Sequence, residues 1–373
     1  EVRGALVERM KEGVELEKDQ EKVFKDLGEL FDGEEGGWKP QKSPYEGVKM
    51  EIKYSQQKKG KRSIALGRAY GTADCTAEEA AAWYFEYCSR ERMAVDREEG
   101  NHARLEIRNG EGRVNEKQFA TVKRMPLLFH KREFVFKHIL QRKGAESLSV
   151  AVSPVDDKID YGGGVGKVVR GTTKAIFTAT NLEPIGEIPQ SKLELLQYLD
   201  AGGHIPVTLI NKKIPLALGA LEEVRNSFNQ DDEVDRAALA SLAHTIKNEQ
   251  QHYTEEEKEA IRKGKEFYLK CKEDEHFDKL KSPDERVKMK LVHVDRESLV
   301  TAVATTVADA SVEECAAHEF SKLGNRYFTK YAKEIDGITF LKVNNVNSHT
   351  LYYITTRTLG FPGLAPRDAR SKI

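Results

Sequence analysis

Apolar and polar residues alternate over residues 48–55, which is the period of a β-strand with one face covered and one face in water. The apolar positions of this stretch are Val48, Met50, Ile52 and Tyr54. Further strand signals follow at 103–108, 113–124, 133–142, 147–154 and 165–182. Asn109-Gly110 and the glycine run 162–164 supply turn residues between neighbouring strands. The pattern predicts an antiparallel meander, one face of which needs a cover.

The predicted cover is the segment from Gly203 to Phe228, where apolar residues recur at helical spacing and Pro206 fits the first turn of a helix. Pro215 predicts a kink or a division into two helices, because proline removes a backbone donor. The apolar stripe consists of Val207, Ile210, Ile214, Ala217, Leu218, Leu221, Val224 and Phe228. The predicted fold class is α+β, a curved antiparallel sheet wrapped around a long C-terminal helix.

The chain contains an internal repeat. KSPYEGVKM at residues 42–50 returns as KSPDERVKM at 281–289, identical at seven of nine positions and 239 residues further on. Two shorter similarities follow, TAEEAAAW at 76–83 with SVEECAAH at 311–318, and RVN at 113–115 with NVN at 345–347. Solenoid repeats have periods of roughly 20–50 residues, so this longer period indicates duplicated domains in tandem.

The repeat predicts how the chain is divided. Arg367-Asp368 falls at the place that Arg132-Glu133 has in the first copy, so the second copy would lack what the first builds between about residues 139 and 228. We therefore expect a fragment of a longer protein. Its predicted parts are a helical linker or end of a preceding repeat at 1–37, a complete domain at 38–228, a charged helical linker at 229–280, and the N-terminal half of a second domain at 281–373.

Composition limits the partners. Charged residues make up 32% of the chain and the formal net charge is -1, which argues against the broad positive field of a nucleic-acid-binding protein. The sequence has no run of about 18 apolar residues and no signal-peptide pattern, so we expect a cytoplasmic protein, at most peripheral to membranes. The four cysteines lie far apart, which indicates neither a disulfide framework nor a zinc knuckle; they are Cys75, Cys88, Cys271 and Cys315.

Three motifs occur in a fixed order along the first copy. They are PLLFHKREFV at 126–135, Val169-Arg170-Gly171, and Gly203-His204-Ile205-Pro206 at the start of the helical stripe. Together they resemble the START family, the lipid-transfer domains related to steroidogenic acute regulatory protein. The resemblance covers roughly residues 40–228, and 281–373 by way of the repeat.

Two features depart from the family pattern. Val95-Asp96 stands where the family usually has Trp-Asp, and SKLELLQYLDA at 191–201 is an extra segment, which we interpret as an elaboration near the cavity mouth. The resemblance implies a helix-grip fold of the START/Bet v 1 type with an internal cavity. It also implies that the protein holds a lipid or other hydrophobic molecule, for transfer or sensing, without catalysis and without a cofactor.

The helical stripe and the inward positions of the sheet would line such a cavity. Burial of each methylene is worth about 0.8 kcal/mol, so shape and volume would dominate selection. Arg124, or Arg132, is a candidate for a lipid head group, although a salt-bridged surface arginine is the simpler interpretation. Any apolar candidate can equally be plain core, because alternation does not tell which strand face points inward. The candidate ligand-binding residues are Leu105, Ile107, Phe119, Arg124, Phe136, Phe177, Ile210, Ile214 and Leu218.

Other functions remain open at this point. Helix-grip folds include cyclases and hydrolases, and Glu106 and His138 are the strand residues to check for catalysis. A tandem array could instead act as a scaffold, with 229–280 binding a protein that the sequence does not identify. Trp83-Tyr84-Phe85 could enter a membrane transiently during exchange, or pack inside the domain.

Common chemical motifs are missing. GGGVGK at 162–167 lacks the Ser or Thr that follows a P-loop lysine, so a hairpin turn explains it better. The ten histidines form no H-E-x-x-H motif, and Cys271 with His276 lacks two further ligands at zinc spacing, so no metal is expected. No G-x-S-x-G nucleophile motif is present.

Overall fold

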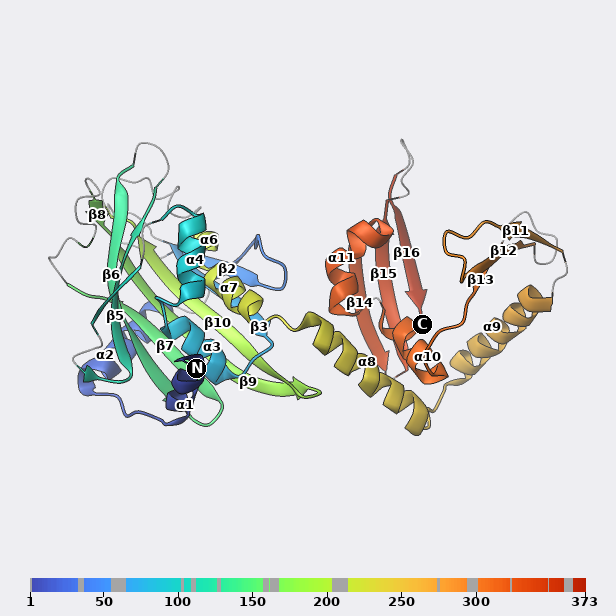
Figure 1. Cartoon of the computed structure of the whole chain (residues 1–373), viewed down its shortest axis with the longest axis horizontal. Coiled ribbons are helices and arrows are strands. Elements are labelled where there is room, and N and C mark those ends of the chain that lie inside the picture. The colour runs from blue at the N-terminus through green and yellow to red at the C-terminus, as the bar shows by residue number, and fades with distance from the viewer. Residues whose placement is uncertain are drawn as a thin grey trace. The chain divides into compact units, whose positions relative to one another are not determined.

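The computed structural model divides the chain into two compact units, Glu1–Gln230 (unit 1) and Asp231–Ile373 (unit 2), which Figure 1 shows coloured along the chain. The structure describes residues 2–32, 37–54, 65–101, 104–108, 112–125, 129–156, 161, 168–202, 214–273, 276–293, 301–322, 324–347, 349–358 and 365–373. Each unit has its own hydrophobic core, so each is described by itself.

Unit 1 is built on one ten-stranded sheet in the order β1-β2-β3-β10-β9-β7-β6-β5-β4, with β8 parallel to β6 and the other pairs antiparallel. The strands are β1 (Lys39–Gln41), β2 (Lys49–Tyr54), β3 (Ala65–Ala73), β4 (Leu105–Arg108), β5 (Glu116–Lys123), β6 (Lys131–Lys143), β7 (Ser147–Pro154), β8 (Val168–Arg170), β9 (Thr172–Ile185) and β10 (Ile188–Asp200). Its helices are α1 (Val2–Lys11), α2 (Lys18–Asp32), α3 (Ala77–Phe85), α4 (Arg90–Glu98), α6 (Ile214–Ala217) and α7 (Ala220–Ser227). The architecture is α+β.

Residues 191–200 of the segment interpreted from the sequence as an elaboration near the cavity mouth form most of β10. This strand pairs with β9 on one side and with β3 on the other, so it joins the two halves of the sheet. Its sequence KLELLQYL mixes strand and helix periods because some residues on both faces are covered, which hides the strand signal.

Helices α3, α6 and α7 pack on the inner face of the sheet. Thr76 and Glu79 form a capping box that starts α3, and small alanines bring this helix close to β7 and β9. The ring of Tyr84 on α3 stacks on that of Phe177 with centroids 4.3 Å apart. Together with the curved sheet, these helices form the helix-grip fold.

The C-terminal helical segment lies against β3 because that strand has glycines. A Cβ on Gly67 would lie 2.5 Å from Cγ2 of Ile214, so only glycine admits the helix there. The segment is divided into α6 and α7 as predicted, although the division falls at Leu218-Gly219 and not at Pro215. Residues 203–213, the predicted start of the long helix, lie outside the described residues.

Helix α2 covers the outer face of the same sheet, over β7 and β9. Leu27 and Phe31 are buried there against Leu66, Ile139 and Ala151. The sheet of unit 1 is therefore covered on both faces, and the segment 1–37, predicted as a helical linker or the end of a preceding repeat, contributes α2 to this packing.

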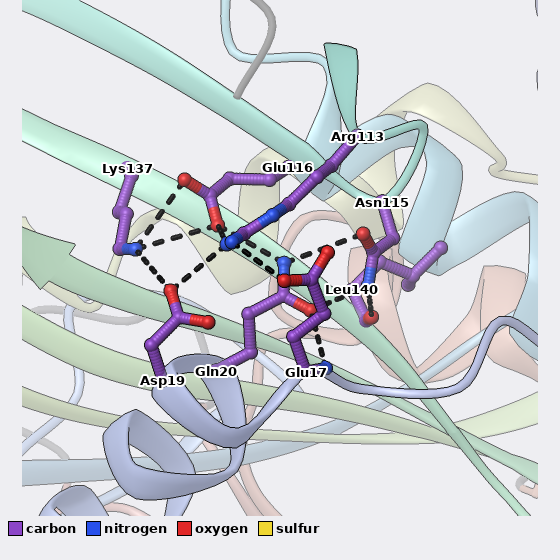
Figure 2. Close-up of polar contacts among 8 residues, drawn as sticks. All are labelled: Glu17, Asp19, Gln20, Arg113, Asn115, Glu116, Lys137 and Leu140. Carbon is purple, nitrogen blue, oxygen red and sulfur yellow. Dashed lines mark hydrogen bonds and ion pairs between the residues drawn. The ribbon is translucent and has the colours of Figure 1, made fainter. Parts of the chain in front are cut away.

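A polar network fixes the start of α2 to β5 and β6 (Figure 2). Gln20 is fully buried and donates from Nε2 to Asn115 Oδ1 at 3.3 Å and to Glu116 Oε2 at 3.0 Å. Around it, Arg113 donates to Glu17 and Asp19 at 2.8 Å each, and Lys137 donates to Glu116 at 3.3 Å. Because a buried amide left without partners is costly, this network specifies where α2 docks.

Unit 2 contains two three-stranded antiparallel sheets, β11-β12-β13 and β14-β15-β16, within the part of the chain that the structure describes. Its strands are β11 (Phe277–Leu280), β12 (Lys288–Val292), β13 (Thr301–Thr305), β14 (Ile338–Asn347), β15 (Thr350–Arg357) and β16 (Arg367–Lys372). Its helices are α8 (Asp231–Asn248), α9 (Glu255–Glu273), α10 (Val312–Ser321) and α11 (Arg326–Asp336). Helix α8, from the segment predicted as a charged linker, packs against α10 and α11.

The elements from β11 to β16 follow the same order as those from β1 to β6, helices included. Ser311 and Glu314 form a capping box at the start of α10, as Thr76 and Glu79 do at the start of α3. Strand register also coincides, since the pairs Lys49–Tyr70 and Met50–Ala69 correspond to Lys288–Thr305 and Met289–Ala304, and the pair Lys123–Arg132 corresponds to Arg357–Arg367.

We predict that Gln20→Ala lowers the free energy of unfolding of unit 1 by about 1–3 kcal/mol, because it leaves the buried side chains of Asn115 and Glu116 short of a partner. Urea denaturation followed by tryptophan fluorescence measures this change in unit 1, since Trp38 and Trp83 are the two tryptophans of the chain. Lys25→Ala on the exposed face of α2 is the matched control and is expected to change stability by no more than about 0.5 kcal/mol. Equal effects of the two substitutions would contradict a specific docking role for Gln20.

Candidate functional site

Unit 1 contains a cavity of about 730 Å³ between the inner face of its sheet and helices α4, α6 and α7. Apolar lining residues include Val95, Phe134, Phe136, Val152, Leu199, Leu216 and four alanines, Ala175, Ala201, Ala217 and Ala220. Polar lining residues include Arg92, Asp96, Arg104, Thr121, Lys123, His138, Gln197 and Glu223. A mostly apolar hollow with a few polar groups is the usual form of a small-molecule site.

Alternation along β9 explains why the interior is hollow at one end and filled at the other. Thr173, Ala175 and Phe177 are buried at alternate positions, while Ile176 contributes to the outer core. Phe177 fills the interior against Tyr84, but the smaller side chains of Thr173 and Ala175 leave space. The cavity follows from small residues at one end of an inward-facing strand row.

His138 lies at the aromatic end of the cavity. It is fully buried among the rings of Tyr84, Tyr87 and Phe119, and its Nδ1–H donates to the backbone carbonyl of Phe85 at 3.0 Å. Burial lowers its pKa to about 3, with help from nearby arginine charges. The imidazole is therefore neutral near pH 7, with Nδ1 carrying the proton.

A charged cluster centred on Asp96 of α4 forms another part of the wall. Asp96 is almost fully buried and bonds to both Arg104 and Lys123. Burial alone would raise the pKa of Asp96, but the hydrogen bonds from these two cations outweigh it and lower the pKa. Arg104 also donates to the backbone carbonyl of Tyr87 at 3.0 Å and lies over its ring. Asp96 therefore forms an ion pair with each of the two cations.

Three other polar atoms of the wall have no hydrogen-bond partner among the described residues. They are Nε of Arg92, Oγ1 of Thr121 and Oε2 of Glu223. Arg92 is 4% exposed and lies over the rings of Trp83 and Tyr87, and burial lowers its pKa. A buried polar atom without a partner costs about 1–3 kcal/mol, so three of them around one cavity mark its polar lining.

The structure distributes the sequence-predicted residues over different places. Arg124 and Phe136 line the cavity. Phe119 and Phe177 are fully buried, and Ile214 and Leu218 are buried in the same core, without lining the described cavity. Ile107 is partly buried on β4, Leu105 is 43% exposed, and Ile210 lies outside the described residues. Ligand contact by any of the nine stays a prediction.

The structure also shows where the residues lie that the sequence analysis considered for other roles. Arg132 is buried and donates to the carbonyl of Ala201, so it is not a surface arginine. Trp83, Tyr84 and Phe85 are all buried in α3, where they pack. Glu106 is exposed on β4 and pairs with Lys117 at 3.3 Å. No described helix is long and apolar enough to cross a bilayer.

Sequence reasoning missed Arg92, Thr121 and Glu223. A signal for the first was its position four residues before Asp96, which places both on one face of a helix. Glu223 stands next to the apolar stripe of α7, where Leu221 and Val224 are buried. Thr121 gave no signal beyond its place in a strand. In the described parts of the chain, no group of three or more His, Cys, Asp or Glu side chains is placed to hold a metal ion.

No family model and no curated protein matches the chain. Human STARD10 is similar over 62% of this chain and 87% of its own, with 16% identity and a TM-score of 0.43. Human StAR-related lipid transfer protein 5 is similar over 56% and 94%, with 17% identity and a TM-score of 0.43. The lipid transfer and protein localization domain of human StarD13 is similar over 58% and 100%, with 15% identity and a TM-score of 0.41. Because these identities and TM-scores are low, the assignment of the helix-grip fold rests on the strand order and the helices of unit 1.

We predict that His138→Gln reduces the acid sensitivity of unit 1. The folded pKa of His138 is about 3 and the unfolded value about 6.5, so the unfolded state binds the extra proton and stability falls as pH drops from 6.5 toward 3. The substitution should remove a slope of up to about 1.4 kcal/mol per pH unit. Urea denaturation between pH 7.5 and 4.5, followed by tryptophan fluorescence, measures it.

The matched control is His130→Gln, since His130 is exposed in the same unit. We expect this control to keep the pH slope of the native chain. An unchanged slope in His138→Gln would show that other groups cause the acid sensitivity of unit 1.

Proposed function

We propose that unit 1 holds one hydrophobic small molecule in its cavity, as a carrier or a sensor. The observation that supports this most directly is the cavity of about 730 Å³ itself, at a place where a solid core would have side chains. The volume lies within the range of sites for drug-sized ligands. The apolar wall would contribute about 0.8 kcal/mol for each methylene that leaves water.

The polar lining suggests what kind of group the ligand carries. Asp96 is paired with Arg104 and with Lys123, whereas Arg92 and Glu223, whose Nε and Oε2 atoms are buried, form no ion pair in the described residues. Arg124 also lines the cavity, but its side chain is exposed. Nε of Arg92 donates, whereas the Glu223 carboxylate accepts. A hydroxyl or amide group of the ligand can accept from Arg92 and donate to Glu223, whereas a phosphate or carboxylate would be repelled by Glu223. We therefore propose an uncharged amphiphile.

We also propose that unit 1 is not an enzyme. His138 is neutral near pH 7 because burial lowers its pKa to about 3, which suits a packed core imidazole better than a general acid or base. Glu106 lies on the exposed part of the edge strand and is paired with Lys117. We extend the same proposal to the transfer of a lipid between membranes and to a cytoplasmic location of the protein.

Residues 277–372 are, in our proposal, the counterpart of the first half of unit 1. The identical order of elements, the matching capping boxes and the coinciding strand registers support this. The described strands of unit 2 form two three-stranded sheets, β11-β12-β13 and β14-β15-β16, whose orders match those of β1-β2-β3 and β4-β5-β6 in unit 1.

Native mass spectrometry of the full chain, followed by solvent extraction, tests the ligand proposal. We expect a mass increase from one bound molecule, released chemically unchanged as an uncharged amphiphile. A chain that stays free of ligand after incubation with lipid extract would overturn the proposal. Conversion of an added ligand during incubation would favour the enzyme.

We predict that Glu223→Gln changes selectivity between two probes of equal chain length, dodecanol and dodecanoate. It should weaken dodecanol binding by about tenfold, because the charged acceptor is lost, and it should strengthen dodecanoate binding, because repulsion is removed. Displacement of the neutral dye Nile red measures both affinities. Glu222→Gln is the matched control on the same helix, since Glu222 pairs with Arg225 outside the cavity wall. An unchanged ratio of affinities in Glu223→Gln would exclude Glu223 as the selecting group.

A further inference from the structure

The inner face of β10 carries one amide in a row of leucines. Successive side chains of a strand point to opposite faces, so Gln197 shares the inner face with Leu193, Leu195 and Leu199. Leu193 and Leu195 are fully buried, whereas Gln197 and Leu199 line the cavity of unit 1. Covering an amide without a hydrogen-bond partner is unfavourable, so a glutamine in this row has to be explained by what it binds.

The cross-strand neighbours of Gln197 offer its amide no partner. Gln197 is opposite Gly67 of β3 on one side and opposite Ala175 of β9 on the other. Directly opposite residues share a face of the sheet, and neither glycine nor alanine has a polar side-chain atom. Within the part of the chain that the structure describes, the Gln197 side chain forms no hydrogen bond. Its amide, which can both donate and accept, is therefore available to a molecule in the cavity.

Strand register extends this position into a row across the inner face of the sheet. Gln197 is opposite Ala175 on β9. Ala175 is opposite Val152 on β7, and Val152 is opposite His138 on β6. All four residues line the cavity. Neighbouring strands lie roughly 4.8 Å apart, so the three spacings from β10 to β6 amount to about 14 Å along the sheet. The row is apolar in the middle and has a hydrogen-bonding side chain at each end.

The His138 end of this row carries the other polar groups of the cavity. Nδ1 of His138 donates to a backbone carbonyl, so Nε2 of the neutral ring is an acceptor. The rings of His138 and Tyr87 are in contact, and Arg92 lies over the ring of Tyr87. The charge of Arg92 also contributes to the low pKa of His138, and the charge of Glu223 acts on the pKa of Arg92. Gln197 therefore lies at the opposite end of the row from Arg92 and Glu223.

We propose that the cavity selects an elongated, uncharged molecule with a polar group at each end, and that Gln197 binds the second of these groups. This rests on the proposed function, in which Arg92 and Glu223 bind the first. The apolar body of the ligand lies along Ala175 and Val152. A hydroxyl, ketone or amide suits the Gln197 end, because a side-chain amide both donates and accepts. A molecule with one polar end leaves Gln197 without a partner.

Two probes of equal chain length test this in the full chain. Dodecanol and dodecane-1,12-diol differ only in the second hydroxyl. Gln197→Met nearly keeps the length of the side chain and removes the amide. We expect it to weaken binding of the diol by about tenfold, because the second hydroxyl then loses its partner, and not to weaken binding of dodecanol. Displacement of Nile red measures both affinities.

The matched control is Gln141→Met. Gln141 is half-buried on β6 of the same sheet and does not line the cavity, so the ratio of diol to alcohol affinity should stay that of the native chain. Decane-1,10-diol and tetradecane-1,14-diol, each with its matching alcohol, extend the test to a shorter and a longer span. Circular dichroism of each variant confirms that the chain is folded.

The affinity ratios decide between the outcomes. A diol-to-alcohol ratio that falls in Gln197→Met and not in Gln141→Met, at one of the three lengths or more, supports the proposal. A native ratio in Gln197→Met at all three lengths overturns it. An equal loss of affinity for alcohol and diol also overturns it, because Gln197 would then act only on the shape of the cavity. In both of these cases binding of the alcohols to the native chain leaves the proposed function standing, whereas a native chain that binds neither kind of probe overturns both.

Discussion

The pairing of β9 with β7 on one side and β10 on the other is the interaction on which unit 1 depends. These strands join a half made of β1 to β3 to a half made of β4 to β6, and only the joined sheet has a concave inner face that helices can close. The cavity lies against the inner face of this joined sheet, with lining residues from β5, β6, β7, β9 and β10.

Within that sheet, side-chain size decides where space remains. The inward row of β9 runs from Thr173 through Ala175 to Phe177, and the helices opposite contribute Ala217 and Ala220. A tightly packed protein interior leaves few voids, so a hollow bordered by several small residues is a specific feature of the sequence. Nε of Arg92 and Oε2 of Glu223, which are buried without a hydrogen-bond partner among the described residues, give this hollow a polar side.

The sequence predicted the parts of the fold whose periodicity is undisturbed. The alternation over 48–55 corresponds to β2, and the strand signal at 147–154 coincides with β7. Strand β3 escaped prediction because Gly67 and Gly71, which admit the helical segment, interrupt its apolar pattern. Strand β10 also escaped prediction, because a strand with residues covered on both faces does not alternate cleanly.

The site was harder to predict than the fold. Apolar candidates were chosen by residue type, which does not distinguish Phe136, which lines the cavity, from Phe119 and Phe177, which are buried in the core without lining it. Arg92 and Glu223 come from α4 and α7, which are far apart in sequence. Their meeting at one wall depends on tertiary packing that no local spacing encodes.

Strand β6 carries two neighbouring residues whose side chains point to opposite faces of the sheet. Lys137 belongs to the outer network that holds α2, and His138, the next residue, faces the cavity. One peptide bond therefore separates the N-terminal anchor from the interior wall, since successive side chains of a strand point to opposite faces. Removing residues 17–32 to obtain a shorter protein would uncover the outer face of the sheet behind the cavity, so a compact unit 1 has to begin well before the first strand.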